Sequence, residues 1–370
     1  MNPIRIKYLD GFRGLAILLV VLFHAYSRWT EFVPYGNRFE HVQIFHKGWL
    51  GVQLFFLISG FVILMSLNKC ESLWQFLVKR WLRLFPAMCI ATVLIFATAF
   101  LLPERPLGKP NIQDILPGLL FLPPKWLSVA THSDIGFLEG SFWSLFVEVK
   151  FYIVFGLLYF YAGMRKAIWG IFAIYLLWFA VYVLDRVSGS GVSGIAETAL
   201  RQMGFEHFGW FASGSFAYLY AIEKKINDIL AAAVLALVSC FSVMLNNWDS
   251  WYVFGWAFLI ASVFILTVYS EKMQTIFRFR ALLFVGFVSY PFYLIHENAL
   301  IALTVKFSRI FPDFPAILMP VLPTIFLLAV AYVIAKYLEP VAARFFTTLL
   351  ERAKIYQKTH TTTTNPSSNR

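Results

Sequence analysis

Long apolar stretches recur along this chain from about residue 14 to about residue 336, and short segments rich in charged and polar residues separate them. Most of these stretches approach the roughly 20 apolar residues that an α-helix needs to cross a bilayer, and about ten can be counted. We therefore predict an all-α, polytopic integral membrane protein with about ten transmembrane helices. The stretch over residues 205–222 is short and rich in glycine and serine, so its limits are the least well defined. The predicted helices centre near Val20, Leu57, Leu94, Ile153, Leu176, Ser215, Val238, Leu259, Tyr293 and Phe326.

Composition leads to the same fold class. Of the 370 residues, 59% are hydrophobic and only 14% are charged, whereas soluble domains contain about 25% charged residues. The first apolar stretch could be mistaken for a secretory signal, but it carries Arg13 and His24 and lacks a small-residue cleavage site, so we predict a retained helix. The three cysteines are too few and too widely spaced for a disulfide framework or a zinc site, and we expect no metal.

The distribution of Lys and Arg predicts the topology. A net charge of +11 could suggest a nucleic-acid partner, but in a membrane protein the placement of the cations matters more than their sum. With the N-terminus in the cytoplasm, about eighteen Lys and Arg fall on inside segments and about ten on outside loops. We therefore expect cytoplasmic termini, contact with membrane lipids and no nucleic acid.

This topology divides the chain into a membrane domain, residues 1–345, and a cytoplasmic C-terminal tail, residues 346–370, that is disordered toward its Thr-, Ser- and Asn-rich end. The longest loop, about residues 102–141, falls outside and is rich in proline and large apolar residues, so we expect it to cap the outer face or to re-enter it.

Two ionisable residues belong to the first helix. Arg13 and His24 are eleven residues apart, which is about three turns, so they share a helix face about 16 Å apart along the axis. Asp10 precedes Arg13 by three residues and can pair with it. Such groups are costly in a bilayer unless they are paired or hydrated. The alternatives are that Arg13 snorkels to the surface and that His24 only bonds a carbonyl.

The second and third helices carry two further motifs. Ser59 and Gly60 are small residues that let another helix approach closely, so we predict a packing role and no chemistry for them. Arg80 and Arg83 share a helix face at i, i+3 spacing, which suits bidentate contact with phosphates. The alternative for both arginines is positive-inside anchoring.

Polar stripes mark two later helices. Ser144, Glu148 and Tyr152 recur every four residues beside Trp143, and Ser289, Tyr293 and His296 share a face of a helix that Pro291 interrupts. A carboxylate at this depth needs a partner, and we predict that Glu148 pairs with His24. Lys150 is less suited, because positions i and i+2 point apart on a helix. His296 and Glu297 lie near the end of their helix, where an interfacial role is the alternative.

These residues resemble the acyltransferase 3 family, membrane O-acyltransferases that modify bacterial surface glycans and other extracytoplasmic or secreted acceptors. The match begins with YLDGFRGLA at residues 8–16 and the family's Arg-x10-His signature, formed by Arg13 and His24. The blocks follow in family order and span residues 8–296, whereas Phe146, Val149, Lys150 and Pro291 depart from the usual pattern. The further blocks are residues 55–61, Arg80-x-x-Arg83-x-x-Pro86, residues 142–145 with Glu148, Phe151 and Tyr152, and Ser289-Tyr290 with residues 293–296.

The resemblance implies a membrane-bound O-acyltransferase, with O-acetyl transfer favoured, in the bacterial inner (plasma) membrane. Arg80 and Arg83 would bind the phosphates of cytoplasmic acyl-CoA, with acetyl-CoA as the favoured donor, and the thioester would reach inward along the face of Arg13. His24 would deprotonate a hydroxyl of a glycan or lipid-linked saccharide on the extracytoplasmic side, or carry the acyl group transiently. Glu148 would orient the His24 imidazole. The expected substrate-binding or supporting residues are Asp10, Trp143, Ser144, Tyr152, Tyr293 and His296.

Two other functional classes remain open. A secondary transporter, or an exporter of a small molecule or glycan precursor, would also place charges inside the membrane, but such proteins usually show repeat symmetry, which we do not find. A membrane-embedded receptor or assembly factor would need neither His24 nor paired arginines. Consumption of a thioester by the purified protein would identify the enzyme.

Overall fold

The computed structural model describes residues 6–188, 191–246, 250–353 and 355, and within these residues the regular secondary structure is entirely helical. Eight helical segments in this part of the chain are long and apolar enough to cross a membrane, and the helix Arg280–Ile295 is apolar but shorter. The predicted all-α, polytopic fold is therefore confirmed. The count of ten is not confirmed, although all ten predicted centres fall on helices; the poorly delimited stretch near Ser215 forms a helix of 16 residues.

The helices follow one another closely, and two of them continue into short π-helical segments. The N-terminal part contains α1 (Lys7–Phe23), the π segment His24–Arg28, α2 (Gln43–His46), α3 (Gly51–Leu67), α4 (Leu73–Thr98), α5 (Leu116–Leu120), α6 (Pro124–Thr131) and α7 (Trp143–Ala162). The middle part contains α8 (Met164–Ser188), α9 (Gly191–Gln202), α10 (Phe208–Glu223), α11 (Ile226–Asn246), α12 (Ser250–Tyr269) and α13 (Glu271–Ile276). The last part contains α14 (Arg280–Ile295), α15 (Glu297–Ile310), α16 (Val321–Val333), the π segment Ile334–Leu338 and α17 (Glu339–Arg352).

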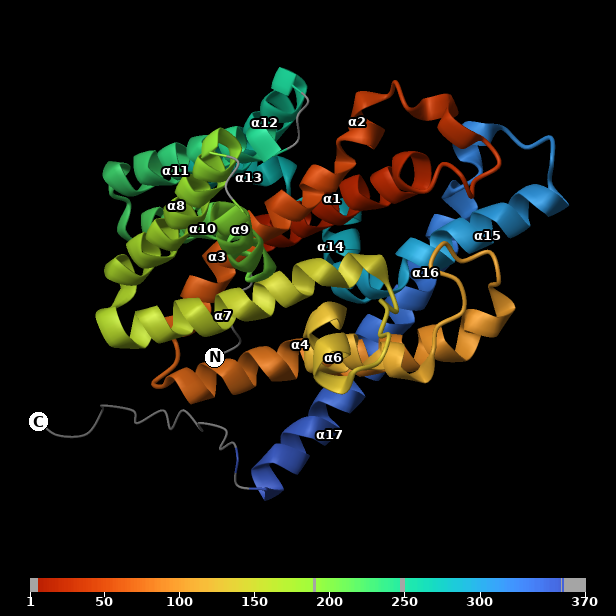
Figure 1. Ribbon diagram of the computed structural model, residues 1–370, viewed down its shortest axis with the longest axis horizontal. Helices are drawn as coiled ribbons and strands as arrows, with labels where there is room; N and C mark the ends of the chain where they lie inside the picture. Colours follow the sequence, from red (N-terminus) through yellow and green to blue (C-terminus); the bar gives the residue numbers. More distant parts are fainter. Residues whose placement is uncertain (1–5, 189–190, 247–249, 354, 356–370) are drawn as a thin grey trace, which may run out of the picture.

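Helices α1 and α3 lie in the middle of the bundle, with α8, α11 and α12 on one side and α15 and α16 on the other (Figure 1). Helix α1 packs against α3 and α14, and α3 packs against α10. Two glycines make these approaches close. A Cβ added at Gly286 of α14 would collide with the carbonyl of Asp10, and one added at Gly60 of α3 would collide with the carbonyl of Phe211. The predicted packing role of Gly60 is therefore confirmed, because only a residue without a side chain fits there.

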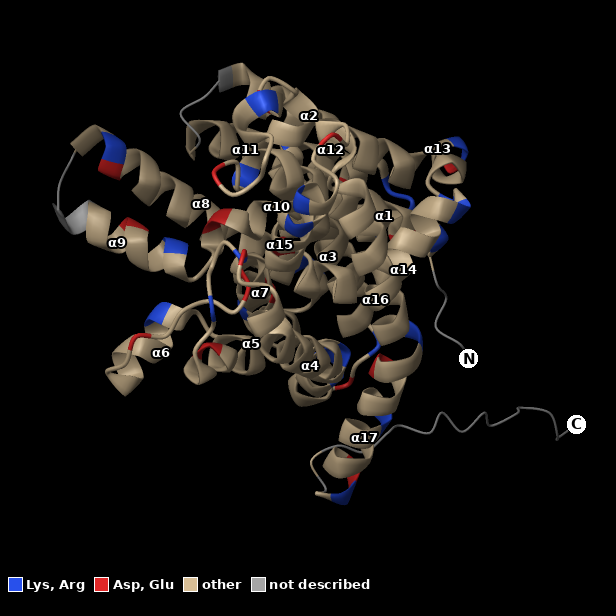
Figure 2. Ribbon diagram, turned by 90° about the vertical axis from the view of Figure 1, so that its right-hand side faces the viewer, with Lys and Arg blue, Asp and Glu red and all other residues tan. Residues whose placement is uncertain are grey.

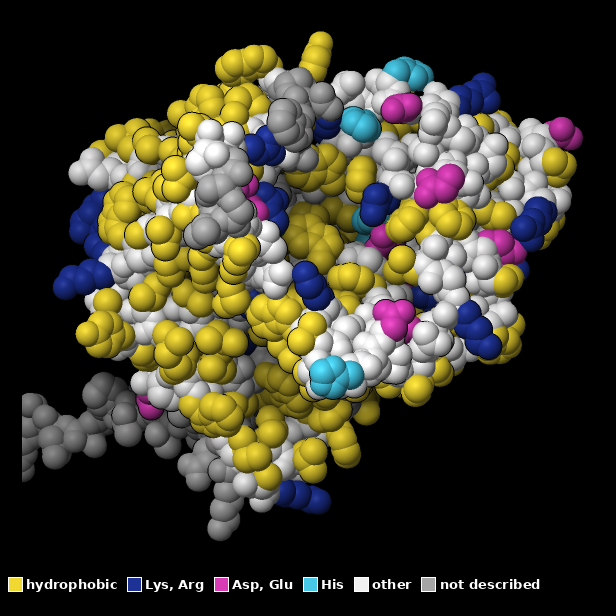
Figure 3. Space-filling view, viewed as in Figure 1, with side chains coloured by type: hydrophobic (Ala, Val, Ile, Leu, Met, Phe, Trp, Pro, Cys, Tyr) yellow, Lys and Arg dark blue, Asp and Glu magenta, His cyan; other side chains and the backbone are white. Residues whose placement is uncertain are grey.

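The surface is that of a protein whose solvent is lipid. Most helices carry their charged residues at the ends and in the adjoining loops (Figure 2). Large apolar side chains such as Phe160, Leu177 and Leu266 are exposed on the helix surfaces, and hydrophobic side chains cover much of the flanks (Figure 3). Exposed apolar patches of this extent mark contact with a membrane or a partner, and here they coincide with the spans.

The loop between α4 and α7 is tied to the start of α15. Arg105 lies 3.5 Å from the carboxylate of Glu139 and donates a hydrogen bond to the carbonyl of Leu138. The side-chain N–H of Asn298 donates to the carboxylate of Glu139 at 2.7 Å. The side-chain oxygen of Asn298 accepts a hydrogen bond from the backbone N–H of Leu107 at 3.0 Å. These buried bonds hold the loop across the end of the bundle at which His24 lies, called here the His24 end. The opposite end of α1 is called the Arg13 end.

The C-terminal region begins with a helix. Helix α17 runs through the expected domain boundary at residue 345 to Arg352, and Phe346 packs edge-on against the rings of Trp81 and Phe85 of α4. The end that the sequence predicts to be disordered, residues 359–370, lies outside the described residues.

Candidate active site

Arg13 of α1 and His24, the first residue of the π segment that continues it, line two different cavities. Arg13 lines a cavity of about 120 Å³ near the Arg13 end, called here the arginine cavity. His24 lines a cavity of about 500 Å³ at the His24 end, called here the histidine cavity. The expected pair of Asp10 and Arg13 is present, with an N–O distance of 3.1 Å.

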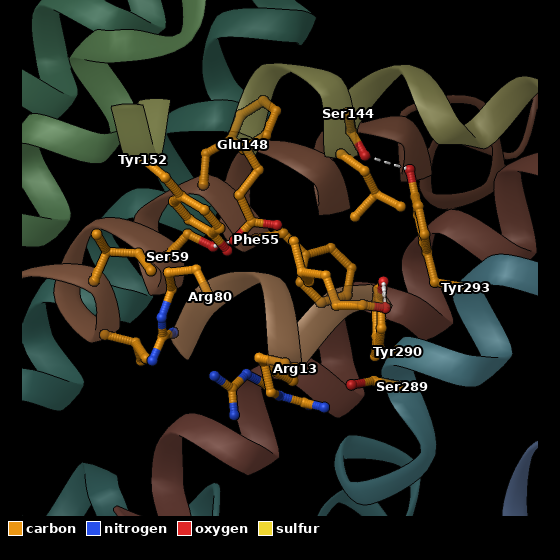
Figure 4. Close-up of a pocket in the computed structure, with 16 residues that line it drawn as sticks. Arg13, Phe55, Ser59, Arg80, Ser144, Glu148, Tyr152, Ser289, Tyr290 and Tyr293 are labelled. Carbon is orange, nitrogen blue, oxygen red and sulfur yellow. Dashed lines mark hydrogen bonds between the residues drawn. The ribbon is translucent and has the colours of Figure 1, made fainter. Parts of the chain in front are cut away.

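Five helices converge on the arginine cavity (Figure 4). Ser144, Glu148 and Tyr152 all line it, so the predicted stripe on α7 is confirmed. Figure 4 shows Arg13 and Glu148 on opposite sides of the cavity. The polar residues that line it are Arg13, Ser59, Arg80, Arg83, Ser144, Glu148, Tyr152, Ser289, Tyr290 and Tyr293.

Charges in the arginine cavity are only partly compensated. Arg83 forms an ion pair with Glu339 at 2.6 Å, whereas Arg80 donates to the hydroxyl of Ser66 at 2.9 Å and makes no ion pair with any described residue. The buried Nε of Arg80 has no hydrogen-bond partner in the part of the chain that the structure describes. Ser59 donates to Glu148 at 2.5 Å, so Ser59, to which we assigned no chemistry, belongs to this cavity. The cavity therefore contains at least one guanidinium, that of Arg80, that forms no ion pair with a carboxylate of the described residues.

The predicted pairing of Glu148 with His24 is wrong. Glu148 lies in the arginine cavity beside Ser59, whereas the carboxylate next to His24 belongs to Glu297, 3.6 Å from His24 Nε2. Glu148 is also not paired with Lys150, because that ammonium donates to the carbonyl of Gln202. The sequence led us to expect Glu148 at the level of His24, but the packing of α7 places its side chain in the arginine cavity instead of the histidine cavity.

Glu297 is the functional candidate that sequence reasoning missed. It is 3% exposed, and it accepts hydrogen bonds from the indole N–H of Trp29 at 3.2 Å and from the backbone N–H of Ser141. These donors fix the carboxylate so that it faces His24. Its position next to His296 in the sequence was the available signal, but an interfacial role was the equally plausible interpretation.

His296 lies behind His24 and lines neither of the two cavities. Its Nε2 is 3.1 Å from His24 Nδ1, and the two rings meet edge to face. The other ring nitrogen, Nδ1, lies 2.9 Å from the carbonyl of Tyr293. His296 is fully buried and His24 is 8% exposed, so the two rings form a buried pair.

Tyr293 lines both cavities. Its hydroxyl lies 2.7 Å from that of Ser144 and donates to the carbonyl of Ser141 at 2.8 Å. The side chain therefore lies between the arginine cavity and the histidine cavity, held by the start of α7. Of the remaining expected residues, Trp143 lines the histidine cavity.

The histidine cavity is the larger and more aromatic of the two. Trp29, Trp49 and Trp143 contribute indole rings to its walls. The side chains of Arg201, Glu206 and Asn246 form a polar group elsewhere on the lining, joined to one another by hydrogen bonds. Figure 3 shows a hollow on this face of the molecule, with charged side chains at its rim. A cavity of this lining suits a ligand with both hydroxyl groups and flat apolar faces.

Comparison with known proteins adds a family match. The family model described as "Acyltransferase domain" matches residues 6–338. The O-acetyltransferase OatA of Staphylococcus aureus (strain NCTC 8325 / PS 47) is 25% identical over 329 residues, which cover 80% of this chain and 50% of the relative. The peptidoglycan O-acetyltransferase OatA of Listeria monocytogenes is 21% identical over 323 residues, covering 78% and 48%. The chain thus spans about half the length of these relatives. No solved structure matches this chain with comparable significance.

Proposed function

The chain belongs to the acyltransferase domain family, whose model matches residues 6–338, and from that premise we propose that it is a membrane-bound O-acyltransferase. The relatives named O-acetyltransferase favour acetyl as the group transferred. The donor is acyl-CoA at the cytoplasmic face, and the acceptor is a hydroxyl of a glycan or lipid-linked saccharide on the extracytoplasmic side of the bacterial inner membrane. One observation carries the proposal: Tyr293 joins a cavity lined by three arginines to a cavity that contains a histidine and a carboxylate.

The arginine cavity supports the donor assignment. Guanidinium groups bind phosphates through paired, charge-assisted hydrogen bonds, and Arg80 lines this cavity without an ion-pair partner among the described residues. Arg13 and His24 are separated by about 16 Å along α1. The pantetheine arm of CoA is an extended chain, so with its phosphates on Arg80 and Arg83 the thioester passes Tyr293 and arrives at His24.

The histidine cavity supports the acceptor assignment. Its tryptophans provide flat faces on which a pyranose ring stacks, and its larger volume of about 500 Å³ fits a saccharide better than the arginine cavity does. His24 Nε2 takes the proton from the acceptor hydroxyl, and the hydroxyl oxygen attacks the thioester carbonyl. The C–S bond then breaks, and the leaving thiolate takes the proton back from the imidazolium. Glu297, 3.6 Å away, stabilises that cation.

A sidedness experiment tests the proposal. In sealed proteoliposomes of known orientation, acyl-CoA supplied only at the Arg13 end should acylate a saccharide supplied only at the His24 end. Acyl-CoA supplied only at the His24 end should not substitute for it. The measurements are thiol release and acylated acceptor, with protein-free vesicles as the control for leakage. Transfer that requires donor and acceptor on the same side would refute the transmembrane path, and passage of acceptor without thiol release would indicate an exporter.

Substitution of the two arginines should weaken donor binding unequally. Arg80→Ala should raise the KM for acyl-CoA by roughly 10- to 100-fold, because one or two charge-assisted hydrogen bonds to the donor are lost. Arg83→Ala should have a smaller effect, because Glu339 already neutralises Arg83. Lysine at position 80 should rescue only in part, since it lacks the planar fork.

Steady-state kinetics of the purified variants measures this effect, and Arg344→Ala is the matched control, because Arg344 is an exposed cation of α17 that lines neither cavity. An unchanged KM for Arg80→Ala, together with reduced insertion, would favour the simple positive-inside role.

A further inference from the structure

The hydrogen-bond partners of the two buried histidines determine where their protons lie. His24 Nδ1 is 3.0 Å from the carbonyl oxygen of Val20, and His296 Nδ1 is 2.9 Å from the carbonyl oxygen of Tyr293. A carbonyl oxygen only accepts hydrogen bonds, so each Nδ1 must carry the hydrogen. A neutral imidazole has one ring hydrogen, and therefore both Nε2 atoms are unprotonated acceptors in the resting site.

This arrangement gives the contact between the rings a single direction. His296 Nε2 lies 3.1 Å from His24 Nδ1 and, as an acceptor, receives the Nδ1–H bond. That hydrogen is then shared between two acceptors, the Val20 carbonyl and His296. The remaining nitrogen of His24, Nε2, carries only a lone pair and faces Glu297 and the histidine cavity.

We propose that His296 is a positioning residue, which holds the proton of His24 on Nδ1 so that Nε2 is the nitrogen that reacts. The inference rests on the proposed acyl transfer in one respect only, that His24 is the reacting group. When Nε2 takes a proton, the positive charge strengthens the bond from Nδ1–H to His296, so His296 stabilises the same cation that Glu297 faces. His296 neither gains nor loses a proton, and it lines neither of the cavities in which donor and acceptor would lie.

The other candidate for this role does not fit. His207 also lines the histidine cavity, but its Nε2 lies 3.3 Å from the carboxylate of Glu206 and its ring packs against Phe56 and Trp143. Its contacts with Glu206, Phe56 and Trp143 make it part of the cavity wall.

Kinetics of matched variants provides the first test. His296→Phe removes one of the two acceptors of the His24 Nδ1–H and leaves only the Val20 carbonyl. This change should lower kcat by ~10²-fold or more, as expected when an imidazole adopts the wrong tautomer. KM for donor and acceptor should stay within about threefold, because His296 lines neither cavity. His296→Gln keeps an acceptor oxygen near the position of Nε2 and should retain a clear part of kcat. His41→Phe and His41→Gln, at an exposed histidine, are the controls.

Nitrogen NMR of the protein labelled at histidine provides a second test that does not depend on activity. The ring signals of His24, assigned by their loss in His24→Asn, should show a protonated Nδ1 in the wild type. In His296→Phe they should show Nε2–H or a mixture of tautomers. Unchanged signals in His296→Phe, or equal losses of kcat in the Phe and Gln variants, would overturn the positioning role. A wild-type protein that transfers no acyl group would instead refute the proposed function, whatever the tautomer.

Discussion

Replacing His24 with alanine should abolish measurable acyl transfer while the protein still inserts into the membrane. His24 Nε2 faces the histidine cavity, and it is the nitrogen available to accept the proton of the acceptor hydroxyl. General acid–base groups contribute typically 10²–10⁴-fold to rate, so turnover should fall by at least roughly that factor. Release of free thiol from acyl-CoA, measured with and without acceptor, gives the rate.

Insertion must be checked independently of activity. His24→Asn keeps a polar group near the Val20 carbonyl and should be as inactive as His24→Ala, which separates loss of the base from loss of packing. Size-exclusion profiles and thermal unfolding of the purified variants report on the fold. If either variant is correctly folded and turns over at near the wild-type rate, His24 is not the catalytic base.

Replacing Glu297 with glutamine should lower kcat by roughly 10²–10⁴-fold, because the neutral amide no longer stabilises the His24 cation. The amide has the same shape as the carboxylate and can still accept one of the two hydrogen bonds from Trp29 and Ser141. The KM for acyl-CoA should change little, because Glu297 lies in the histidine cavity, whereas the proposed site for the donor phosphates is the arginine cavity.

Glu148→Gln is the informative comparison for this prediction, because Glu148 lines the arginine cavity and its loss should act on donor binding. Glu40→Gln, at an exposed position, is the control for the charge change itself. The opposite pattern, with kcat lost in Glu148→Gln and kept in Glu297→Gln, would restore the pairing expected from the sequence and contradict the geometry of the site.

Which side chains of one helix are neighbours or share a face could be predicted from the sequence, because the helical repeat fixes the angle and rise between residues. The pairing of Asp10 with Arg13 and the stripe of Ser144 and Glu148 on α7 are confirmed for this reason. The all-α membrane fold followed in the same way from the length and apolar character of successive stretches.

Which side chains of different helices meet could be decided only from the tertiary structure. Which carboxylate faces His24 is decided by how far α7 and α14 are rotated about their axes and how deeply each is set against α1. Close contacts at small residues determine that rotation and depth, as where Gly286 meets the carbonyl of Asp10. Helical periodicity contains no information about such contacts, so Glu148 and Glu297 were equally compatible with the pattern. The sequence by itself determined the fold class, the family motifs and the residues that share a face. Only the packing of the helices decided that Glu297 and His296 surround His24 and that Tyr293 lies between the two cavities.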